Sequence, residues 1–501
     1  MRAEDSTPGD ENRAPDAPAG GPQPPRLARL AERVALVGFV LYAIFAPHSI
    51  AGAEMGLALV AAGWLARSIV TGRTNIRRTP LDLPLWLFLG WTVLSALLSA
   101  EPGISLPKLQ SVSVVFLFYL AQALLKRRAA LLLALLMIAS GVAGVLWSMA
   151  DITLGRGVMI EELNAESPFR EFQLGKGDAV WRVNAVRVAS VREIDEAIRR
   201  SPAGERLRVS LIVQGEHAER PGFVVTDELK ARPSPSGIRS EGRTHRFRAS
   251  GWTRHYETFS ETLQMLAQLA LGLGLAHFQR RGRGWQVRLA LSATALLAVG
   301  IALTAMRTVL VAFVCGAIVI AWRAVEGRAR LLVAGIVVLV LALGTFSVWR
   351  TRVSGALKLE DYSSTLRREV ARAGLRGIWQ DPLFGHGMDA VKRHWTEWGF
   401  PGTDMIHLHS TPLQIAFDRG LPALLFWLWM IWTCWRMAAR GERLFGADTD
   451  AGRPGLLLGA TGAIAGFFVS SLVNYNFGDA EVALVFWWLI GSVVALSPRA
   501  E

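Results

Sequence analysis

Residues 126–150 read KRRAALLLALLMIASGVAGVLWSMA, three basic residues followed by an uncharged and mostly apolar run. A helix needs about 20 such residues to cross the roughly 30 Å hydrocarbon core of a bilayer. Runs of this kind recur along the chain of 501 residues, 51% of which are hydrophobic. The sequence therefore predicts an all-α polytopic membrane protein. Trp427 and Trp429 are expected at the bilayer interface, where tryptophan rings anchor helices.

About twelve spans are predicted, and the basic residues between them give an orientation. Lys and Arg gather in alternate connections, such as those at 126–128, 280–288 and 436–443, and the connections between these are almost free of them. Because positively charged loops stay in the cytoplasm, both termini are expected there. These loops also explain the formal charge of +13 without a nucleic-acid partner. The spans are 33–47, 50–70, 84–100, 107–125, 129–150, 257–277, 287–305, 308–325, 331–349, 411–436, 455–474 and 482–497.

The spans and the polar segments divide the chain into seven parts. Residues 1–30, rich in Pro, Gly and charge, are expected to form a disordered cytoplasmic tail. The other parts are helices 1–5 (31–150), an inserted domain (151–232), a linker (233–256), helices 6–9 (257–349), a polar loop (350–410) and helices 10–12 (411–501). Both long polar segments fall on the non-cytoplasmic face. Cys315 and Cys434 lie inside apolar spans, which argues against a disulfide or a thiolate metal site.

The inserted segment has the pattern of a small α+β domain. Three strand-like runs and one short amphipathic helix are predicted, at 157–163, 179–183, 207–213 and 191–198. With the turn at Leu174–Asp178, their order resembles a PDZ domain of the bacterial periplasmic type. The loop that binds a peptide carboxylate in that family would precede Gly157, where a membrane helix has only just ended. A peptide-docking domain and a structural insert without a peptide ligand both remain open.

Three residues that are costly to place at a membrane surface mark a candidate site. His409 stands where the chain re-enters the membrane, and a histidine exchanges protons near neutral pH. Arg307 lies at the boundary between two spans, where the alternative to function is a side chain that reaches to the interface. Arg367 opens a helix that is predicted to run to Trp379, before Pro382. For the histidine, the alternative is a satisfied interface residue.

The surrounding residues leave several roles open. The helix also carries Arg368, Arg372 and Arg376, so spacing alone does not favour Arg367. Gly385 and Gly387 lie in the next turn, and they allow close backbone approach to a ligand or to a neighbouring helix. His407 and His409 form a pair that suits a metal, but no third ligand with suitable spacing stands out. No metal site is therefore predicted.

Together these residues resemble a known family. The matching residues are Arg367, Asp381-Pro382, Gly385-His-Gly387, His409-Ser410, Leu413 and Gly420. They look like the periplasmic loop and following helix of the O-antigen ligase and polymerase family, which usually shows an arginine, a Pro-Leu-x-Gly-x-Gly turn, a His-Asn pair and a later glycine. The likeness extends to Thr304–Thr308, Arg248–Gly251 and Pro80–Ala100. Ser410 stands where the family usually has Asn, and the PDZ-like insert is atypical.

The resemblance implies a metal-independent, inverting glycosyltransferase without cofactors, in the bacterial inner membrane with its active face in the periplasm. The donor would be an undecaprenyl diphosphate-linked glycan. The acceptor would be a lipid core, as in lipopolysaccharide, a growing polysaccharide or a protein. Arg307 and Arg367 would hold the diphosphate, and His409 would orient or deprotonate the acceptor hydroxyl. The residues implied in binding the substrates are Arg248, Gly385, Gly387 and Ser410.

Two other classes of function remain open. A transporter or flippase of the same lipid-linked glycan would carry charged residues near the bilayer midplane on discontinuous helices. A membrane scaffold bearing a PDZ-like domain would leave Arg307, Arg367 and His409 without a role. Within the enzyme class, the sequence does not separate ligase, polymerase and protein oligosaccharyltransferase, and it leaves the sugar, the linkage and the oligomeric state open.

Overall fold

The computed structural model describes residues 25–213, 215–240, 242–253, 255–327, 330, 362–402, 406–444 and 450–497, and these are mostly helical. Every predicted span falls on a helix except 331–349, which lies outside the described residues. The helices of the membrane part are α1 (Arg26–Phe45), α2 (Ile50–Thr71), α3 (Asp82–Leu98), α4 (Pro102–Lys108), the 3-10 helix η1 (Leu109–Val115), α5 (Phe116–Leu124), α6 (Arg127–Leu154), α9 (Tyr256–Arg281), α10 (Trp285–Leu303), α11 (Arg307–Ala324), α15 (Thr411–Leu444), α16 (Gly452–Ser471) and α17 (Ala480–Leu496).

In the described part of the chain, seven helices are long and apolar enough to cross a membrane. They are α2, the continuous α4–η1–α5 segment, α6, α10, α11, α15 and α16, and α3 and α17 are shorter apolar helices. The helix α9 falls on a predicted span but is more polar, since it buries Glu261, Gln264 and Gln268. A multi-pass membrane protein is thus supported, and twelve crossings remain a prediction.

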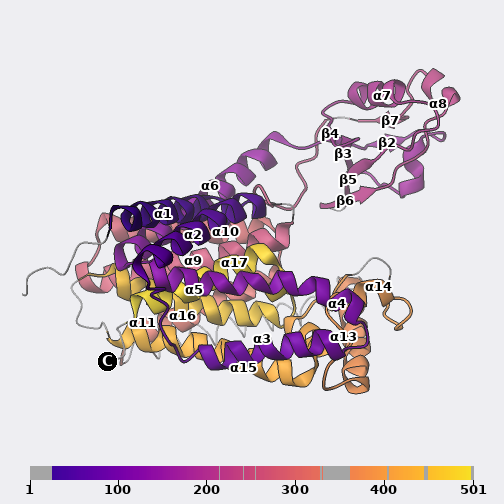
Figure 1. The fold of residues 1–501 in the computed structure, drawn as a ribbon. Helices are drawn as coiled ribbons and strands as arrows, with labels where there is room; N and C mark the ends of the chain where they lie inside the picture. Colours follow the sequence, from indigo (N-terminus) through magenta and orange to yellow (C-terminus); the bar gives the residue numbers. More distant parts are fainter. Residues whose placement is uncertain are drawn as a thin grey trace, which may run out of the picture.

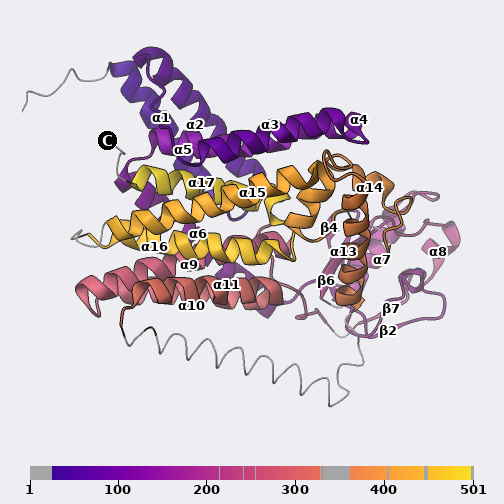
Figure 2. The same cartoon turned by 90° about the horizontal axis from the view of Figure 1, so that it is seen from below.

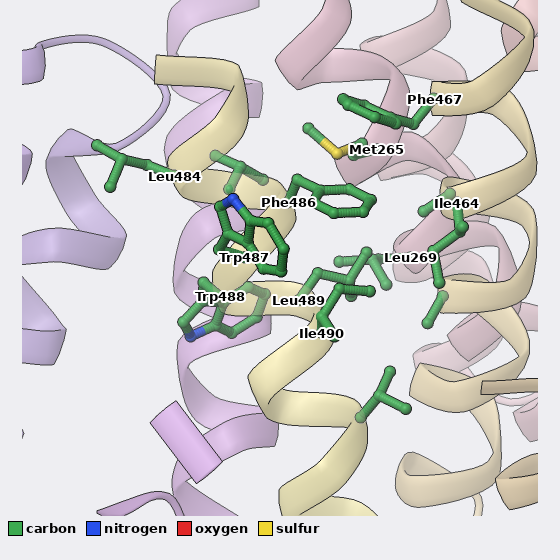
Figure 3. Packing of buried hydrophobic residues seen from close by; sticks show 14 of the residues in the cluster. Met265, Leu269, Ile464, Phe467, Leu484, Phe486, Trp487, Trp488, Leu489 and Ile490 are labelled. Atoms are coloured by element: carbon green, nitrogen blue, oxygen red, sulfur yellow. The ribbon is translucent and has the colours of Figure 1, made fainter. Parts of the chain in front are cut away.

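The helix α17 lies in the core of the bundle. Its aromatic residues Phe486, Trp487 and Trp488 are buried, and Phe486 packs beside Met265 of α9 and Phe467 of α16 (Figure 3). Trp427 of α15 is also buried, between the rings of Phe468 and Phe477. The predicted interface position is therefore wrong for Trp427. Trp429 remains exposed.

Glycine brings helices close together at two interfaces of the bundle. A Cβ atom on Gly38 of α1 would lie 2.6 Å from the carbonyl oxygen of Gly56 in α2. A Cβ atom on Gly272 of α9 would likewise overlap with the backbone of Gly459 in α16. Small residues of this kind let membrane helices touch along their backbones. The second contact fixes α9 against α16. The start of α9 and the end of α16 both lie beside the candidate site described below.

The insert is a small α+β domain, as the sequence predicts. Its elements are β1 (Val158–Met159), β2 (Glu162–Leu163), η2 (Pro168–Phe172), β3 (Ala179–Val183), β4 (Val186–Arg187), α7 (Val191–Arg200), β5 (Val209–Val213), β6 (Glu216–Arg220), α8 (Asp227–Ala231) and β7 (Ile238–Arg239). One sheet has the order β1-β3-β5-β6, with β4 beside β3, and β2 pairs with β7; all pairs are antiparallel. Ile194 and Ile198 of α7 pack into its apolar core.

The segment 233–256, predicted as a linker, is partly structured. Its strand β7 pairs with β2, and Thr244 forms an antiparallel bridge with Arg156, so the two chain segments that join the domain to the membrane part are tied together. The domain projects from one end of the bundle, and the helices α13 (Tyr362–Gln380) and α14 (Ala390–His394) lie at the same end (Figure 1). The C-terminal end of α17 lies at the opposite end. The described parts of both long polar segments thus share one end of the molecule.

Candidate functional site

The helix α13 presents one of its arginines to the bundle. Its described part already includes Tyr362, so the predicted start at Arg367 is too late; no proline or glycine interrupts residues 362–366. It ends at Gln380, before Pro382, as predicted. Arg367 is half-buried, whereas the other three arginines of the helix are exposed: Arg368, Arg372 and Arg376. The structure thus distinguishes Arg367 from its neighbours, which helical spacing does not.

The turn after α13 is hydrogen-bonded to a break in α15. At Gly420 the backbone leaves the helical conformation, with φ 80° and ψ 171°, and Pro422 has no amide hydrogen to donate. The carbonyl oxygens of Phe417 and Asp418 are thereby freed. They accept hydrogen bonds from the amides of His386 and Gly387, at 2.8 and 2.9 Å. The break holds the turn through backbone bonds, and so positions α13 over the start of α15.

Close packing in this turn explains why residues 385 and 387 are glycines. A Cβ atom on Gly385 would lie 2.5 Å from the carbonyl oxygen of Phe417. A Cβ atom on Gly387 would overlap with the hydroxyl of Ser105. Of the two alternatives that the sequence leaves open, the structure places a neighbouring helix against both glycines. Their predicted role in binding substrate remains a prediction.

The histidine loop is fixed to the first turn of α15. The Ser410 hydroxyl accepts a hydrogen bond from the Leu413 amide at 3.5 Å, which makes it the cap of the helix. The side chain of Gln414 accepts from the Leu408 amide at 2.7 Å and donates to the Asp418 carboxylate at 2.8 Å. Gln414 therefore links the loop to the break in α15. Ser410 is buried and acts here on the helix.

His407 and His409 form a compact pair on this loop. Their ring centroids are 4.3 Å apart, and Nδ1 of His407 accepts a hydrogen bond from the backbone amide of His409. The backbone of His409 has φ 52°, a left-handed conformation that is uncommon outside glycine and that clusters at functional sites. Among the described residues, no group of three or more His, Cys, Asp or Glu side chains is arranged to hold a metal ion.

Burial and positive charge keep both imidazoles neutral. Burial is the largest cause and lowers the pKa of His407 to about 4; a backbone hydrogen bond partly opposes this, and the charge of Arg367 lowers the pKa further. Burial, then His407 and Arg367, lowers the pKa of His409 to about 3. Both rings are therefore uncharged at neutral pH, and each has a nitrogen that can accept a proton. Arg367 lies within electrostatic range of both histidines.

Arg248 and Arg367 converge on the start of α9. The guanidinium of Arg248 lies over the ring of Tyr256, with its carbon 4.4 Å from the centroid. Arg367 also acts electrostatically on Tyr256 and on Glu257. Arg248 forms an ion pair with Glu216 of β6 at 2.7 Å, so the inserted domain reaches the site. Two of the predicted cations thus share one small region.

Arg307 begins α11 at the same end of the bundle. Its neighbour Thr308 accepts a hydrogen bond from the side chain of Asn474 at 3.3 Å. The backbone carbonyl of Asn474 in turn accepts from the Thr411 amide at 3.0 Å, two residues after His409. The next residue, Tyr475, lies against His407, with ring centroids 5.5 Å apart. The α16–α17 loop thereby connects the start of α11 to the histidine pair.

A cavity of about 100 Å³ lies beside the histidine loop, between α3, η1, α15 and α17. Its wall combines aromatic and apolar side chains with charged ones. Lys108 and Asp389 lie at its edge, and buried Asp418 and Arg419 lie deeper. Ile406 and Tyr475 also line it, so the cavity reaches the histidine loop.

The sequence did not single out several residues of this site. Asn474 and Tyr475 lie in a short connection between two spans that has no basic residues, and Tyr256 and Glu257 lie at the start of a span. A polar signal was present, since five of the eight residues from Asn474 to Glu481 are Asn, Asp, Glu or Tyr. Gln414 has no such signal, because its role depends on the break in α15.

Comparison with known proteins covers the part of the chain that holds most of this site. A family model described as O-antigen ligase matches residues 292–428. This segment contains Arg307, Arg367 and His409, but Arg248 lies outside it. A search of curated proteins finds no match to the chain. Residues 292–428 are therefore similar to the O-antigen ligase family, and the apolar helices among the described residues indicate a multi-pass membrane protein.

Proposed function

We propose that this protein is a glycosyltransferase that transfers a glycan from an undecaprenyl diphosphate-linked donor to an acceptor hydroxyl at the periplasmic face of the bacterial inner membrane. One observation carries the proposal: Arg367 is the half-buried arginine of α13, and it lies within electrostatic range of two neutral histidines at the end of a helical bundle. A cation beside a neutral base suits a reaction between an anionic leaving group and an alcohol.

The arginines would bind the donor diphosphate. A guanidinium binds phosphate oxygens with two parallel hydrogen bonds and keeps its charge at every physiological pH. Arg367 and Arg248 both act on Tyr256, and Arg307 starts α11 beside Asn474. As the bond between the anomeric carbon and the diphosphate oxygen breaks, negative charge grows on the diphosphate, and these cations stabilise it. The proposed reaction draws its positive charge from the arginines and needs no metal ion.

His409 would act on the acceptor. Its neutral imidazole takes the proton of the acceptor hydroxyl while the acceptor oxygen bonds to the anomeric carbon and the polyprenyl diphosphate leaves from the opposite face. The product therefore has inverted configuration. Donor binding adds negative charge near His409, which raises the pKa of the imidazole and makes it a better base in the complex. The cavity beside Ile406 and Tyr475 is the proposed place for the acceptor.

Reconstitution with a purified donor tests this proposal. The full chain in liposomes is given a lipid-linked glycan and, in separate reactions, a lipid core, a glycan or a protein acceptor, with and without a chelator. Transfer with inversion that is unaffected by the chelator is expected. His409→Ala and Arg367→Ala should strongly reduce transfer while the donor still reaches the outer leaflet. Loss of donor translocation in these variants would instead indicate a transporter, and unchanged transfer would reject the site.

A further inference from the structure

A second hollow lies at the end of the bundle opposite the candidate site. It has a volume of about 1170 Å³ and lies between the α1–α2 pair and the ends of α5, α15 and α17. In Figure 2, the start of α1 and the end of α2 stand apart from the neighbouring helices. Leu36 and Phe39 of α1, Leu124 of α5 and Val494 of α17 give the hollow an apolar wall.

Basic side chains surround this hollow without matching acids. Arg67, Arg77, Arg78, Lys126 and Arg440 line it, against the single carboxylate of Glu32. Glu32 forms an ion pair with Arg67, with 2.7 Å between its carboxylate oxygen and Nε of the arginine. Within the described ranges, no acid lies in ion-pair distance of the other four cations. Basic loops alone would orient the protein in a membrane, but they would not require four such cations around one cavity.

A buried amide adds a second, independent feature. Gln122 of α5 is 2% exposed and lines the hollow. Its side-chain oxygen accepts a hydrogen bond from the Arg77 amide at 3.3 Å, but among the described residues its nitrogen has no partner. A buried amide nitrogen without a partner is unfavourable, so a ligand oxygen would satisfy it. The ligand must also suit the apolar wall a few ångströms away.

We propose that this hollow binds a membrane lipid with an anionic phosphate headgroup. The phosphate would lie among Arg77, Arg78 and Lys126, near the free amide hydrogens of Gln122, and the acyl chains would lie along Leu36 and the wall of α5. Basic pockets between membrane helices bind such headgroups through charge and hydrogen bonds. The proposal does not depend on the glycan transfer proposed above, since the two sites lie at opposite ends of the bundle.

Native mass spectrometry of the full chain tests this proposal. The protein is stripped of lipid in detergent and titrated with phosphatidylglycerol, with phosphatidylcholine of the same acyl chains, or with inorganic phosphate. Saturable binding of phosphatidylglycerol alone is expected. The variant Arg77→Gln/Arg78→Gln/Lys126→Gln should bind it at least about ten-fold more weakly, in line with the loss of three cations near a phosphate. Leu36→Trp should also weaken binding, because it fills the apolar part of the hollow.

The control variant Arg281→Gln/Arg283→Gln/Arg288→Gln removes the same charge from the same end of the bundle, outside the hollow. It should bind phosphatidylglycerol as the unchanged protein does. Equal weakening in both triple variants would overturn the proposal in favour of diffuse surface charge. Equal binding of inorganic phosphate, or of phosphatidylcholine, would overturn it as well. Size-exclusion profiles that match the unchanged protein establish that the variants are folded.

Discussion

At the residue scale, Arg367 differs from its neighbours in burial and not in chemistry. We expect Arg367→Ala to reduce transfer about 100-fold or more, because a cation that stabilises growing negative charge is worth roughly this much. Arg367→Lys should recover only part of the loss, since lysine cannot bind phosphate through a planar fork. Transfer rates with a saturating donor measure this.

The exposed arginines of the same helix are matched controls for that measurement. Arg368→Ala and Arg372→Ala remove the same charge one and five residues further along α13, and both residues are exposed. Each should keep transfer within about two-fold of the unchanged protein, as surface substitutions usually do. A loss in these variants as large as that in Arg367→Ala would contradict the site.

His409 gives a prediction about pH. It must be neutral to accept a proton, so the rate falls as the pH drops through its pKa. In the free protein that pKa is about 3, and the bound diphosphate raises it. Since kcat/KM reports the free protein and kcat reports the complex, the acidic limb of kcat should lie at higher pH than that of kcat/KM. Coinciding limbs, or limbs unchanged in His409→Asn, would contradict a role as base.

Some residues of the candidate site could be predicted from the sequence and others could not. Arg367 and His409 could be singled out because their types and order resemble a family, whereas helical spacing gives Arg368, Arg372 and Arg376 the same standing. What decides between them is which face of α13 meets the bundle. That face depends on the turn at 382–387 and on its contacts with α15, which lie outside the helix.

At the scale of elements, the break in α15 and the turn after α13 depend on each other. Gly385 has φ 68° and lies against the backbone of α15, so an added methyl group has no space. Gly399 has a similar φ of 71°, but no atom lies within 4 Å of a Cβ there. Gly385→Ala should therefore unfold at lower temperature than Gly399→Ala, by an additional destabilisation of about 1–3 kcal/mol. Thermal unfolding in detergent measures the difference.

Equal unfolding temperatures for the two variants would show that the close approach at Gly385 contributes nothing. In that case only the positive φ, which both positions share, would matter. If Gly385→Ala were more stable than Gly399→Ala, the packing of the turn against α15 would be wrong. Transfer activity should follow the same order, since the turn positions α13 and with it Arg367.

The elements were predictable from sequence to different extents. Most spans follow from their apolar runs, and in the insert β3 and α7 follow from alternation and helical spacing. The turn at 382–387 is also visible, through its proline and glycines. Its partner is not, because the carbonyl oxygens of Phe417 and Asp418 are freed only by a tertiary break at Gly420. The position of Trp427 is missed for a related reason: composition does not show which helices surround it.

At the scale of the whole molecule, the inserted domain contacts the candidate site at Arg248. Glu216 of β6 binds Arg248, and Arg248 also donates its backbone amide to the carbonyl of Gly215. Neither contact is predicted from the sequence, because Arg248 lies in the segment 233–256, which was expected to be a linker without contacts to the domain. The insert is therefore part of the surroundings of the site, whatever else it binds.

This contact yields a prediction about the donor. Glu216 neutralises Arg248, so Glu216→Gln should free the guanidinium for the diphosphate. KM for the donor should fall by about 1.4- to 5-fold, the size expected for a partly exposed ion pair of roughly 0.2–1 kcal/mol. Arg248→Gln should raise KM instead, and the double variant should resemble Arg248→Gln, because Glu216 acts through Arg248. Glu219→Gln, an exposed carboxylate on the same strand, is the control and should leave KM unchanged. If Glu216→Gln and Glu219→Gln had the same effect, the domain would act only through its overall charge; if Glu216→Gln raised KM, the ion pair would hold Arg248 in place for the donor rather than compete with it.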